Sequence, residues 1–387
     1  MATMRALSLL RTTRMRPASQ LLRHGAPLQR HSSSSSSPPS SASSFNAAAA
    51  ARTLKLLERR KVTTLDIGIL KRKKKPITMV TAYDYPSAVH VDLAGFDMLL
   101  VGDSLGMVEL GMDTTIPVTV DDIIHHTKAV KRGAERPLIV ADMPFGSCEG
   151  DPYEALKNAQ RMLKEGGADC VKIEGGRGRA KTNWNVVNIP NDSPQHVTSV
   201  CFRSTSVSSE AFALKDEQFI CDSLLPATGC AMSIAAAQAE EIIKDALAVQ
   251  EAGAFAVVLE CVPSPVAKQI TDLLRIPTIG IGAGPETSGQ VLVFHDALGM
   301  LQHPHHAQHV PKFCKRYADV GERIRLGLEE FREDVENRRF PSEEYAPYKM
   351  SKEENEKLEE IVASKYKNAD KSEQDHQGEP SEVTKVY

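Results

Sequence analysis

One short pattern recurs along the chain and limits its fold more than any other feature. It occurs at 92–104 (DLAGFDMLLVGDS), 164–176 (KEGGADCVKIEGG) and 250–262 (QEAGAFAVVLECV). Each copy contains a helix end, a glycine, an apolar run and an acidic residue. Apolar runs this continuous are typical of parallel strands that are covered on both faces. The repetition therefore predicts one strand–helix unit that is used many times.

Helix signals alternate with apolar runs along the middle of the chain. Capping residues and first-turn prolines predict helices that begin at Thr119, Asp151, Ser264 and Asp319. Strands are expected to begin near Ile77, Met98, Leu138, Cys170, Phe255, Pro277 and Val291. Most of these units are spaced near the roughly 30 residues of a βαβ step. The pattern predicts an α/β fold, a (β/α)8 TIM-type barrel with the strand 5 region atypical or disrupted. A doubly wound open sheet is the alternative, but no GxGxxG follows the first strand.

Acidic residues end four of the predicted strands. The carboxyl ends of all strands in such a barrel meet on one face, where catalytic groups gather. Asp103, Asp142, Glu174 and Glu260 hold this position, and alternation places Lys172 on the face of Glu174. Each acid alone could instead cap the following helix. Four together would repel one another without a cation, and hard oxygen ligands suit Mg²⁺. The pattern therefore predicts a magnesium site.

Composition limits the classes of partner. The formal net charge is −3, so no basic field indicates nucleic acid or an anionic membrane. No apolar run reaches the roughly 20 residues of a membrane span. The 7 cysteines form no CxxC pair, which favours free thiols in a reducing compartment. His125 and His126 are interpreted as structural, and the histidines of HPHHAQHV at 303–310 as part of a solvated loop.

The two ends of the chain differ from its middle. Residues 1–55 are rich in arginine and serine and lack acidic residues, which is the composition of an organellar transit peptide. High arginine content favours mitochondrial over chloroplast import, and a disordered tail without a targeting role is the alternative. Residues 56–348 form the predicted barrel domain. The charged segment 349–387 is expected to be a solvated tail after a short helix at Glu353–Ser364. The basic run Lys71–Lys75 is interpreted as a solvated loop.

A series of motifs, taken in order, resembles one enzyme family. They are TMVTAYDYPSA, VGDSLGM, TIPVTVDDIIHHTKAV, ADMPFGS, VKIEGG, VLECVP, IPTIGIGAG and VFHDALGM. Over roughly residues 60–176 and 240–348 the chain resembles ketopantoate hydroxymethyltransferase, also called 3-methyl-2-oxobutanoate hydroxymethyltransferase. The tail motif LQHPHHAQHVPKFCK resembles the plant form. The resemblance implies a homo-oligomeric (β/α) barrel that uses Mg²⁺ and the co-substrate 5,10-methylenetetrahydrofolate. It also implies addition of a hydroxymethyl group to 3-methyl-2-oxobutanoate in pantothenate synthesis.

The same resemblance implies roles for individual residues. The metal residues would be Asp103, Asp142 and Glu174. The residues that hold the oxo acid would be Asp103, Ser104, Asp142 and Lys172. Glu260 of the LECVP motif would accept the proton. A metal ion on the oxo acid would acidify the neighbouring C–H and stabilise the enolate, which attacks the one-carbon unit.

Segment 177–232 departs from the family pattern. The GHxGLTPQ motif of the fifth strand and the glycine-rich loop after it are both missing. His196–Phe202 (HVTSVCF) could form a strand, and Ser209–Cys221 a helix. A mistranslated or alternatively spliced segment is the leading explanation, and genuine divergence is the other. Two further hypotheses stay open: a catalytically impaired homologue that acts only in mixed oligomers, and another Mg²⁺-dependent oxo-acid lyase.

Overall fold

Eight parallel strands close into a barrel in the computed structural model, which describes residues 60–182, 199–203, 235–301 and 311–366. Each strand pairs with the next along the chain, and the last pairs with the first, with Val291 opposite Met79. The strands are β1 Ile77–Thr81, β2 Met98–Val101, β3 Leu138–Asp142, β4 Cys170–Glu174, β5 Ser199–Arg203, β6 Val257–Glu260, β7 Thr278–Ile281 and β8 Gly289–Leu292. The parallel α/β prediction is confirmed. The alternative of an open sheet is wrong, because its first and last strands would not pair.

Strand β5 lies in the segment for which the sequence predicts an atypical or disrupted region. Its backbone pairs in parallel with β4, Ser199 opposite Lys172, and with β6, Arg203 opposite Glu260. A strand is therefore present close to the one expected at His196–Phe202. The helix expected at Ser209–Cys221 lies outside the described residues, as does most of this segment. Disruption there stays a prediction.

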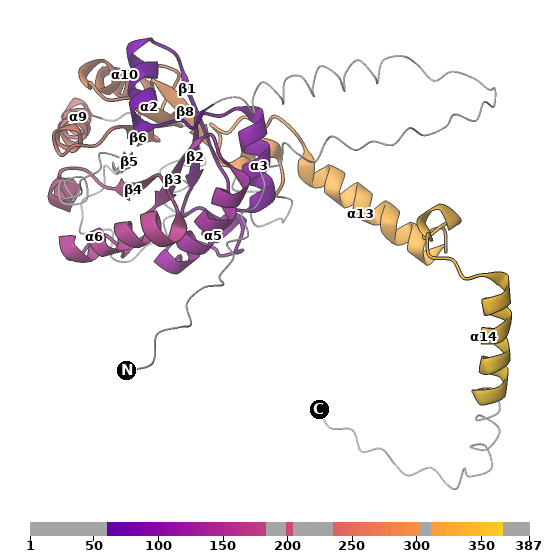
Figure 1. The fold of residues 1–387 in the computed structure, drawn as a ribbon. Helices are drawn as coiled ribbons and strands as arrows, with labels where there is room; N and C mark the ends of the chain where they lie inside the picture. Colours follow the sequence, from indigo (N-terminus) through magenta and orange to yellow (C-terminus); the bar gives the residue numbers. More distant parts are fainter. Residues whose placement is uncertain (1–59, 183–198, 204–234, 302–310, 367–387) are drawn as a thin grey trace, which may run out of the picture. The chain divides into compact units, whose positions relative to one another are not determined.

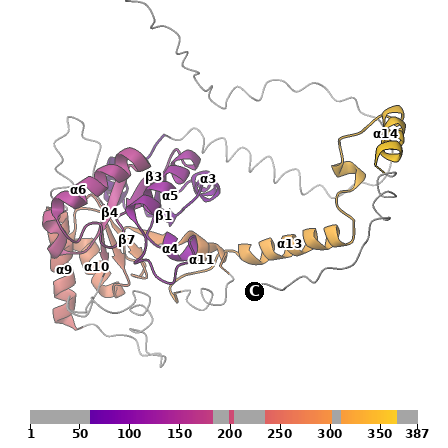
Figure 2. The same ribbon diagram turned by 90° about the horizontal axis from the view of Figure 1, so that it is seen from below.

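Helices alternate with the strands along the chain and continue beyond the last strand. They are α2 Thr64–Arg72, α3 Tyr85–Ala94, α4 Leu105–Val108, α5 Val120–Gly133, α6 Pro152–Arg161, α9 Ala236–Glu251, α10 Ser264–Leu273, α11 Phe294–Leu298, α13 Val320–Glu336 and α14 Lys352–Lys365. Figures 1 and 2 show α5 and α6 on one side of the sheet and α9 and α10 on another. The predicted helix starts are correct to within one residue. At α5, for example, the Thr119 hydroxyl accepts a bond from the Asp122 N–H.

Alternation along the strands divides the core into an inner and an outer part. Every second strand residue faces the barrel interior, where Met98 and Leu100 of β2 pack with Leu138 and Val140 of β3. The residues between them, such as Leu99, pack outward against α3, α5 and α6. A separate outer cluster joins β6 to α9 and α10. The strand residues that face the barrel interior form the inner set. Because this interior is filled by apolar side chains, charged residues of the inner set can meet only at the barrel ends.

The basic run before β1 is not the solvated loop that the sequence suggests. Lys71 lies in α2, and its Nζ donates to the carbonyl oxygens of Thr271, Leu274 and Ile276 at 3.1, 2.7 and 2.6 Å. The other residues of the run are exposed. A helix close to the one expected at Glu353–Ser364 is present as α14.

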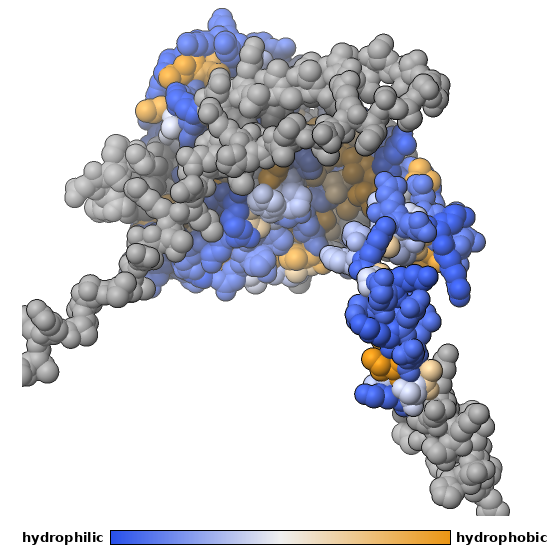
Figure 3. Space-filling model, turned by 45° about the vertical axis from the view of Figure 1, so that its right-hand side comes forward, coloured by the Kyte–Doolittle hydropathy of each residue, from blue (hydrophilic) through white to orange (hydrophobic). Residues whose placement is uncertain are grey.

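The visible surface of the described residues is mostly hydrophilic, with smaller apolar patches between the charged areas (Figure 3). In the part of the chain with described side chains, Cys148, Cys170 and Cys314 are free thiols, as expected. None of the described helices is both long and apolar enough to cross a membrane.

Candidate active site

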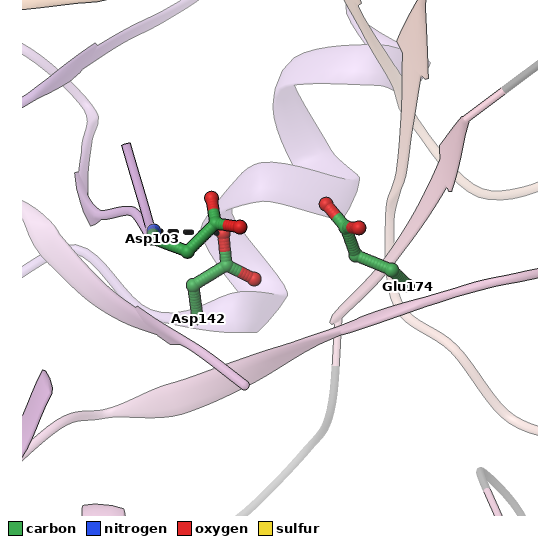
Figure 4. A group of neighbouring side chains, drawn as sticks. All are labelled: Asp103, Asp142 and Glu174. Atoms are coloured by element: carbon green, nitrogen blue, oxygen red, sulfur yellow. Dashed lines mark hydrogen bonds between the residues drawn. The ribbon is translucent and has the colours of Figure 1, made fainter. Parts of the chain in front are cut away.

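Three carboxylates meet at the carboxyl ends of neighbouring strands. Asp142 is the last residue of β3, Glu174 is the last residue of β4, and Asp103 lies two residues beyond β2. One oxygen from each lies within 4.8 Å of the others, and the three side chains point toward one another (Figure 4). Asp142 is buried, whereas Asp103 and Glu174 are half-buried. The structure thus brings together three of the four acidic residues that the sequence places at strand ends.

Lys172 lies beside this group, as alternation along β4 predicts. Its buried ammonium group forms an ion pair with the Asp142 carboxylate and donates to Glu174 Oε1 at 2.9 Å. Burial raises the pKa of the Asp142 carboxyl to about 6. The positive charge of Lys172 opposes this rise, and the negative charge of Glu174 adds to it. One cation therefore balances only part of the negative charge that gathers here.

The donor atoms of the group fit a hard divalent cation. The second oxygen of Asp142, Oδ1, is buried and has no hydrogen-bond partner within the described structure. A buried acceptor without a partner costs about 1–3 kcal/mol, so a cation at this position would remove a penalty. All three ligand groups are carboxylates, which Mg²⁺ and Ca²⁺ prefer. The three residues can therefore hold a metal ion.

Glu260 occupies a separate position at the end of β6. It follows Val258 in the inner set of that strand and is half-buried. It is not part of the three-carboxylate group. The next residue, Cys261, has a φ of +53°, a left-handed conformation that costs free energy in a residue other than glycine. The chain thus turns sharply just after this carboxylate.

Ser104 follows Asp103 in the turn that leads into α4. Its hydroxyl lies 2.7 Å from the phenol oxygen of Tyr83, a fully buried residue in the loop after β1. The sequence singles out the TAYD motif around Tyr83 only as part of the family resemblance, and it assigns no role to this side chain. The one signal of its importance is its position directly after a strand end.

A second buried polar group lies beside Tyr83. His295 at the start of α11 packs its ring 5.6 Å from the Tyr83 ring, and its Nε2 lies 3.3 Å from Glu109 Oε1. Burial lowers the pKa of His295 and raises that of Glu109. Burial therefore disfavours the charged form of both partners. The sequence missed this pair.

The structure describes only some of the remaining histidines, and it does not describe the single tryptophan. His126 has a structural contact, because its Nδ1 lies 2.7 Å from the backbone oxygen of Tyr83. Trp184, His196 and the histidines of segment 303–310 lie outside the described residues.

Comparisons with known proteins give a consistent result. The family described as ketopantoate hydroxymethyltransferase matches residues 61–190 and 228–343. The chain is 46% identical over 300 residues to "3-methyl-2-oxobutanoate hydroxymethyltransferase 1, mitochondrial" of Arabidopsis thaliana, covering 75% of this chain and 79% of that protein. It is 43% identical over 291 residues to the 3-methyl-2-oxobutanoate hydroxymethyltransferase of Moorella thermoacetica, covering 75% and 99%.

Similar solved structures are more distant in sequence. One is a putative phosphonomutase from Burkholderia cenocepacia J2315, with a TM-score of 0.45, 13% identity, and coverage of 59% of this chain and 92% of that chain. Another is a phosphonopyruvate hydrolase in complex with oxalate and Mg²⁺, with a TM-score of 0.43, 11% identity, and coverage of 79% and 99%.

Proposed function

This chain belongs to the ketopantoate hydroxymethyltransferase family, and we propose that it transfers a one-carbon unit from 5,10-methylenetetrahydrofolate to 3-methyl-2-oxobutanoate. The product is 2-dehydropantoate (ketopantoate), an intermediate of pantothenate and coenzyme A biosynthesis. The observation that carries this proposal is the group of Asp103, Asp142 and Glu174, with Lys172 beside them, within the stretch that the family matches. The partners are then two small molecules, an oxo acid and a folate.

The residues at the strand ends divide the work of binding. Asp103, Asp142 and Glu174 would hold Mg²⁺, which when bound draws electron density from the keto group and acidifies the adjacent C–H. Lys172 supplies a compact positive charge for the carboxylate of the oxo acid, while Asp103, Ser104 and Asp142 also hold this substrate. Its ammonium group also contacts the carboxylates of Asp142 and Glu174, so it would lie between the substrate and the metal group.

Glu260 is the base in this proposal. Its carboxylate takes the proton from C3 of the oxo acid, the carbon beside the keto group. Its position on another strand from the three grouped carboxylates leaves it outside the metal group, so its oxygens are not required as ligands. A base must reach within about 3 Å of the proton that it removes, and an inner-set residue at a strand end can do so.

Proton exchange tests this assignment without folate. In D₂O with Mg²⁺, the protein should exchange the C3 hydrogen of 3-methyl-2-oxobutanoate for deuterium. The loss of the C3 proton signal in ¹H NMR measures this exchange. Glu260→Gln should slow exchange at least about 100-fold, the lower range for a general base. Glu251→Gln, an exposed glutamate, is the matched control. Equal exchange by the Glu260→Gln variant and the wild-type protein would overturn the assignment of the base.

Segment 177–232 supports a second candidate function. The family match omits residues 191–227, the stretch from which β5 comes. A barrel with an altered strand 5 region could act as a catalytically impaired partner in mixed oligomers with an intact form, since members of the family are expected to be homo-oligomers. Co-expression with an intact relative followed by native mass measurement tests this idea, and purely homomeric assemblies would exclude it.

Residues 1–55 are proposed to direct import into mitochondria. The plant relatives with which the chain aligns are named as mitochondrial, and the segment has the composition of a transit peptide. Fusion of residues 1–55 to a fluorescent protein should direct it into isolated plant mitochondria, where it becomes protected from added protease. Replacement of the arginines by glutamine should abolish this protection. Uptake by chloroplasts instead would contradict the proposal.

A further inference from the structure

Tyr83 places a buried phenol directly behind the proposed substrate serine. The side chain is fully buried, and its hydroxyl lies 2.7 Å from Ser104 Oγ. Ser104 itself is half-buried at the rim of the barrel. A hydroxyl that faces a fixed partner on one side has fewer orientations left for the other side. This contact therefore controls where the Ser104 hydroxyl proton can point.

The protein holds Tyr83 from several directions. The His126 ring nitrogen Nδ1 contacts its backbone oxygen at 2.7 Å, and its backbone N–H donates to Ser87 Oγ at 3.3 Å. The His295 ring packs 5.6 Å from its ring. Contacts to the backbone and to the ring leave the phenol little freedom to rotate or withdraw. Such rigid support is expected where one hydroxyl must orient another.

A series of polar groups ends at Ser104. It begins at the Phe294 N–H, which can only donate, and which contacts Thr81 Oγ1 at 2.9 Å. The Thr81 side chain also lies close enough to the Tyr83 phenol to influence its pKa. Burial raises the pKa of that phenol far above its ordinary value, so it keeps its proton. When the phenol donates to Ser104 Oγ, the Ser104 proton remains for an outside acceptor.

We propose that Tyr83 is a positioning residue that directs the Ser104 hydroxyl proton toward an oxygen of the bound oxo acid. The inference rests on the proposed function, because it takes Ser104 as a substrate contact. It adds a residue from a fifth strand end, that of β1, to a site otherwise built from the ends of β2, β3, β4 and β6. Tyr83 does not itself touch the substrate in this arrangement, and it acts only through Ser104.

A double-mutant cycle tests this dependence. Four proteins are compared: the wild type, Tyr83→Phe, Ser104→Ala and the double variant. Tyr83→Phe removes one oxygen and leaves the ring packing intact. We expect it to raise KM for the oxo acid about fivefold, typical of one lost neutral hydrogen bond, with kcat changed less than about twofold. In the Ser104→Ala background the same substitution should have no further effect on KM, because its target is absent.

The other outcomes are informative in different ways. An equal rise in KM in both backgrounds would show that the phenol acts through general structure, and it would overturn the inference. An unchanged KM in Tyr83→Phe would do the same. If the wild-type protein neither binds nor converts the oxo acid, the proposed function fails, and this inference fails with it. Unaltered Mg²⁺ affinity and melting temperature in the single variant show that the fold and the carboxylate group are intact.

A second variant decides the matter if Tyr83→Phe does not fold. Thr81→Val keeps the tyrosine and removes the hydroxyl beside its phenol. It should raise KM about twofold to threefold, less than the direct change, and again only when Ser104 is present. A rise that persists in the Ser104→Ala background would overturn the inference.

Discussion

The ammonium group of Lys172 and the metal ion proposed for this site compete for the same carboxylates. Lys172 contacts both Asp142 and Glu174, and its charge repels a cation that they would bind. Lys172→Met removes this repulsion but keeps much of the buried volume. We expect Mg²⁺ to bind about tenfold more tightly, as a change in a close charge pair allows, while binding of the oxo acid weakens. Isothermal titration with each ligand measures both effects.

Lys181→Met is the control for this change, because Lys181 is an exposed lysine. It should leave both affinities at wild-type values. Weaker Mg²⁺ binding in Lys172→Met would show that the lysine organises the carboxylates more than it repels the cation. Unchanged binding of the oxo acid would remove Lys172 from the substrate contacts.

A second residue-scale prediction concerns pH. Burial raises the pKa of the Asp296 carboxyl from 3.8 to about 6, and nearby Arg316 offsets only part of this. Because the folded-state pKa is higher than the unfolded one, the folded protein binds this proton more tightly, and its stability falls as pH rises from about 4 to 6. Asp296→Asn removes that loss. We expect the variant to be more stable than the wild type at about pH 7.5, with a smaller difference at about pH 5.

Urea unfolding of both proteins at the two pH values measures this difference. Asp319→Asn, at an exposed aspartate, serves as the control and should change little. A stability difference that does not depend on pH would mean that the Asp296 carboxyl is not the group that titrates.

The sequence could predict the charged residues of the site but not the buried network behind them. Asp142, Lys172 and Glu174 lie on strands, where the alternation of side chains fixes their direction. The contact between Tyr83 and Ser104 joins two loops, so it depends on how β1 and β2 are placed and on the shape of each turn. No repeating pattern of residue types in the sequence predicts such a contact. The same holds for His295 and Glu109.

At the scale of elements, Lys71 links the start of the barrel to the end of α10, the helix between β6 and β7. Its ammonium group caps the carboxyl end of α10 by donating to three backbone oxygens, including that of Leu274. Lysine near a helix C-terminus also interacts favourably with the helix dipole. We expect Lys71→Met to lower the free energy of unfolding by about 2 kcal/mol, since bonds from charged groups are worth about 1.5–3 kcal/mol each and the site is partly exposed.

Chemical denaturation measures the free energy of unfolding of Lys71→Met and of a second variant, Lys75→Met. Lys75 belongs to the same basic run but is exposed, so its substitution should cost little. Equal losses for the two variants would show that the run acts only through its charge. The sequence did not reveal this capping role because the three acceptor carbonyls lie about 200 positions away along the chain.

Element boundaries were predictable where a local signal marks them. Thr119 bonds to the backbone of its own helix, so its meaning can be read locally. Strand β8 is different, because it begins at Gly289 rather than near Val291. A Cβ on Gly289 would lie 2.4 Å from the backbone oxygen of Ile77, so the glycine permits a close approach to β1. That requirement arises from closure of the barrel and is not visible in one strand.

At the scale of the whole molecule, the proposed metal ligands come from the ends of three neighbouring strands that are far apart in the sequence. Asp103, Asp142 and Glu174 come together only when β2, β3 and β4 are paired, so an unfolded chain has no such site. A ligand that binds only the folded state adds to its stability, by about 2.7 kcal/mol at a free concentration 100 times its Kd. Mg²⁺ should therefore raise the melting temperature of the wild-type protein, and a chelator should reverse the rise. Asp142→Asn should lose most of this gain, whereas Asp121→Asn, at an exposed aspartate, should keep it. An equal gain in Asp142→Asn would mean that Mg²⁺ stabilises the barrel from another place.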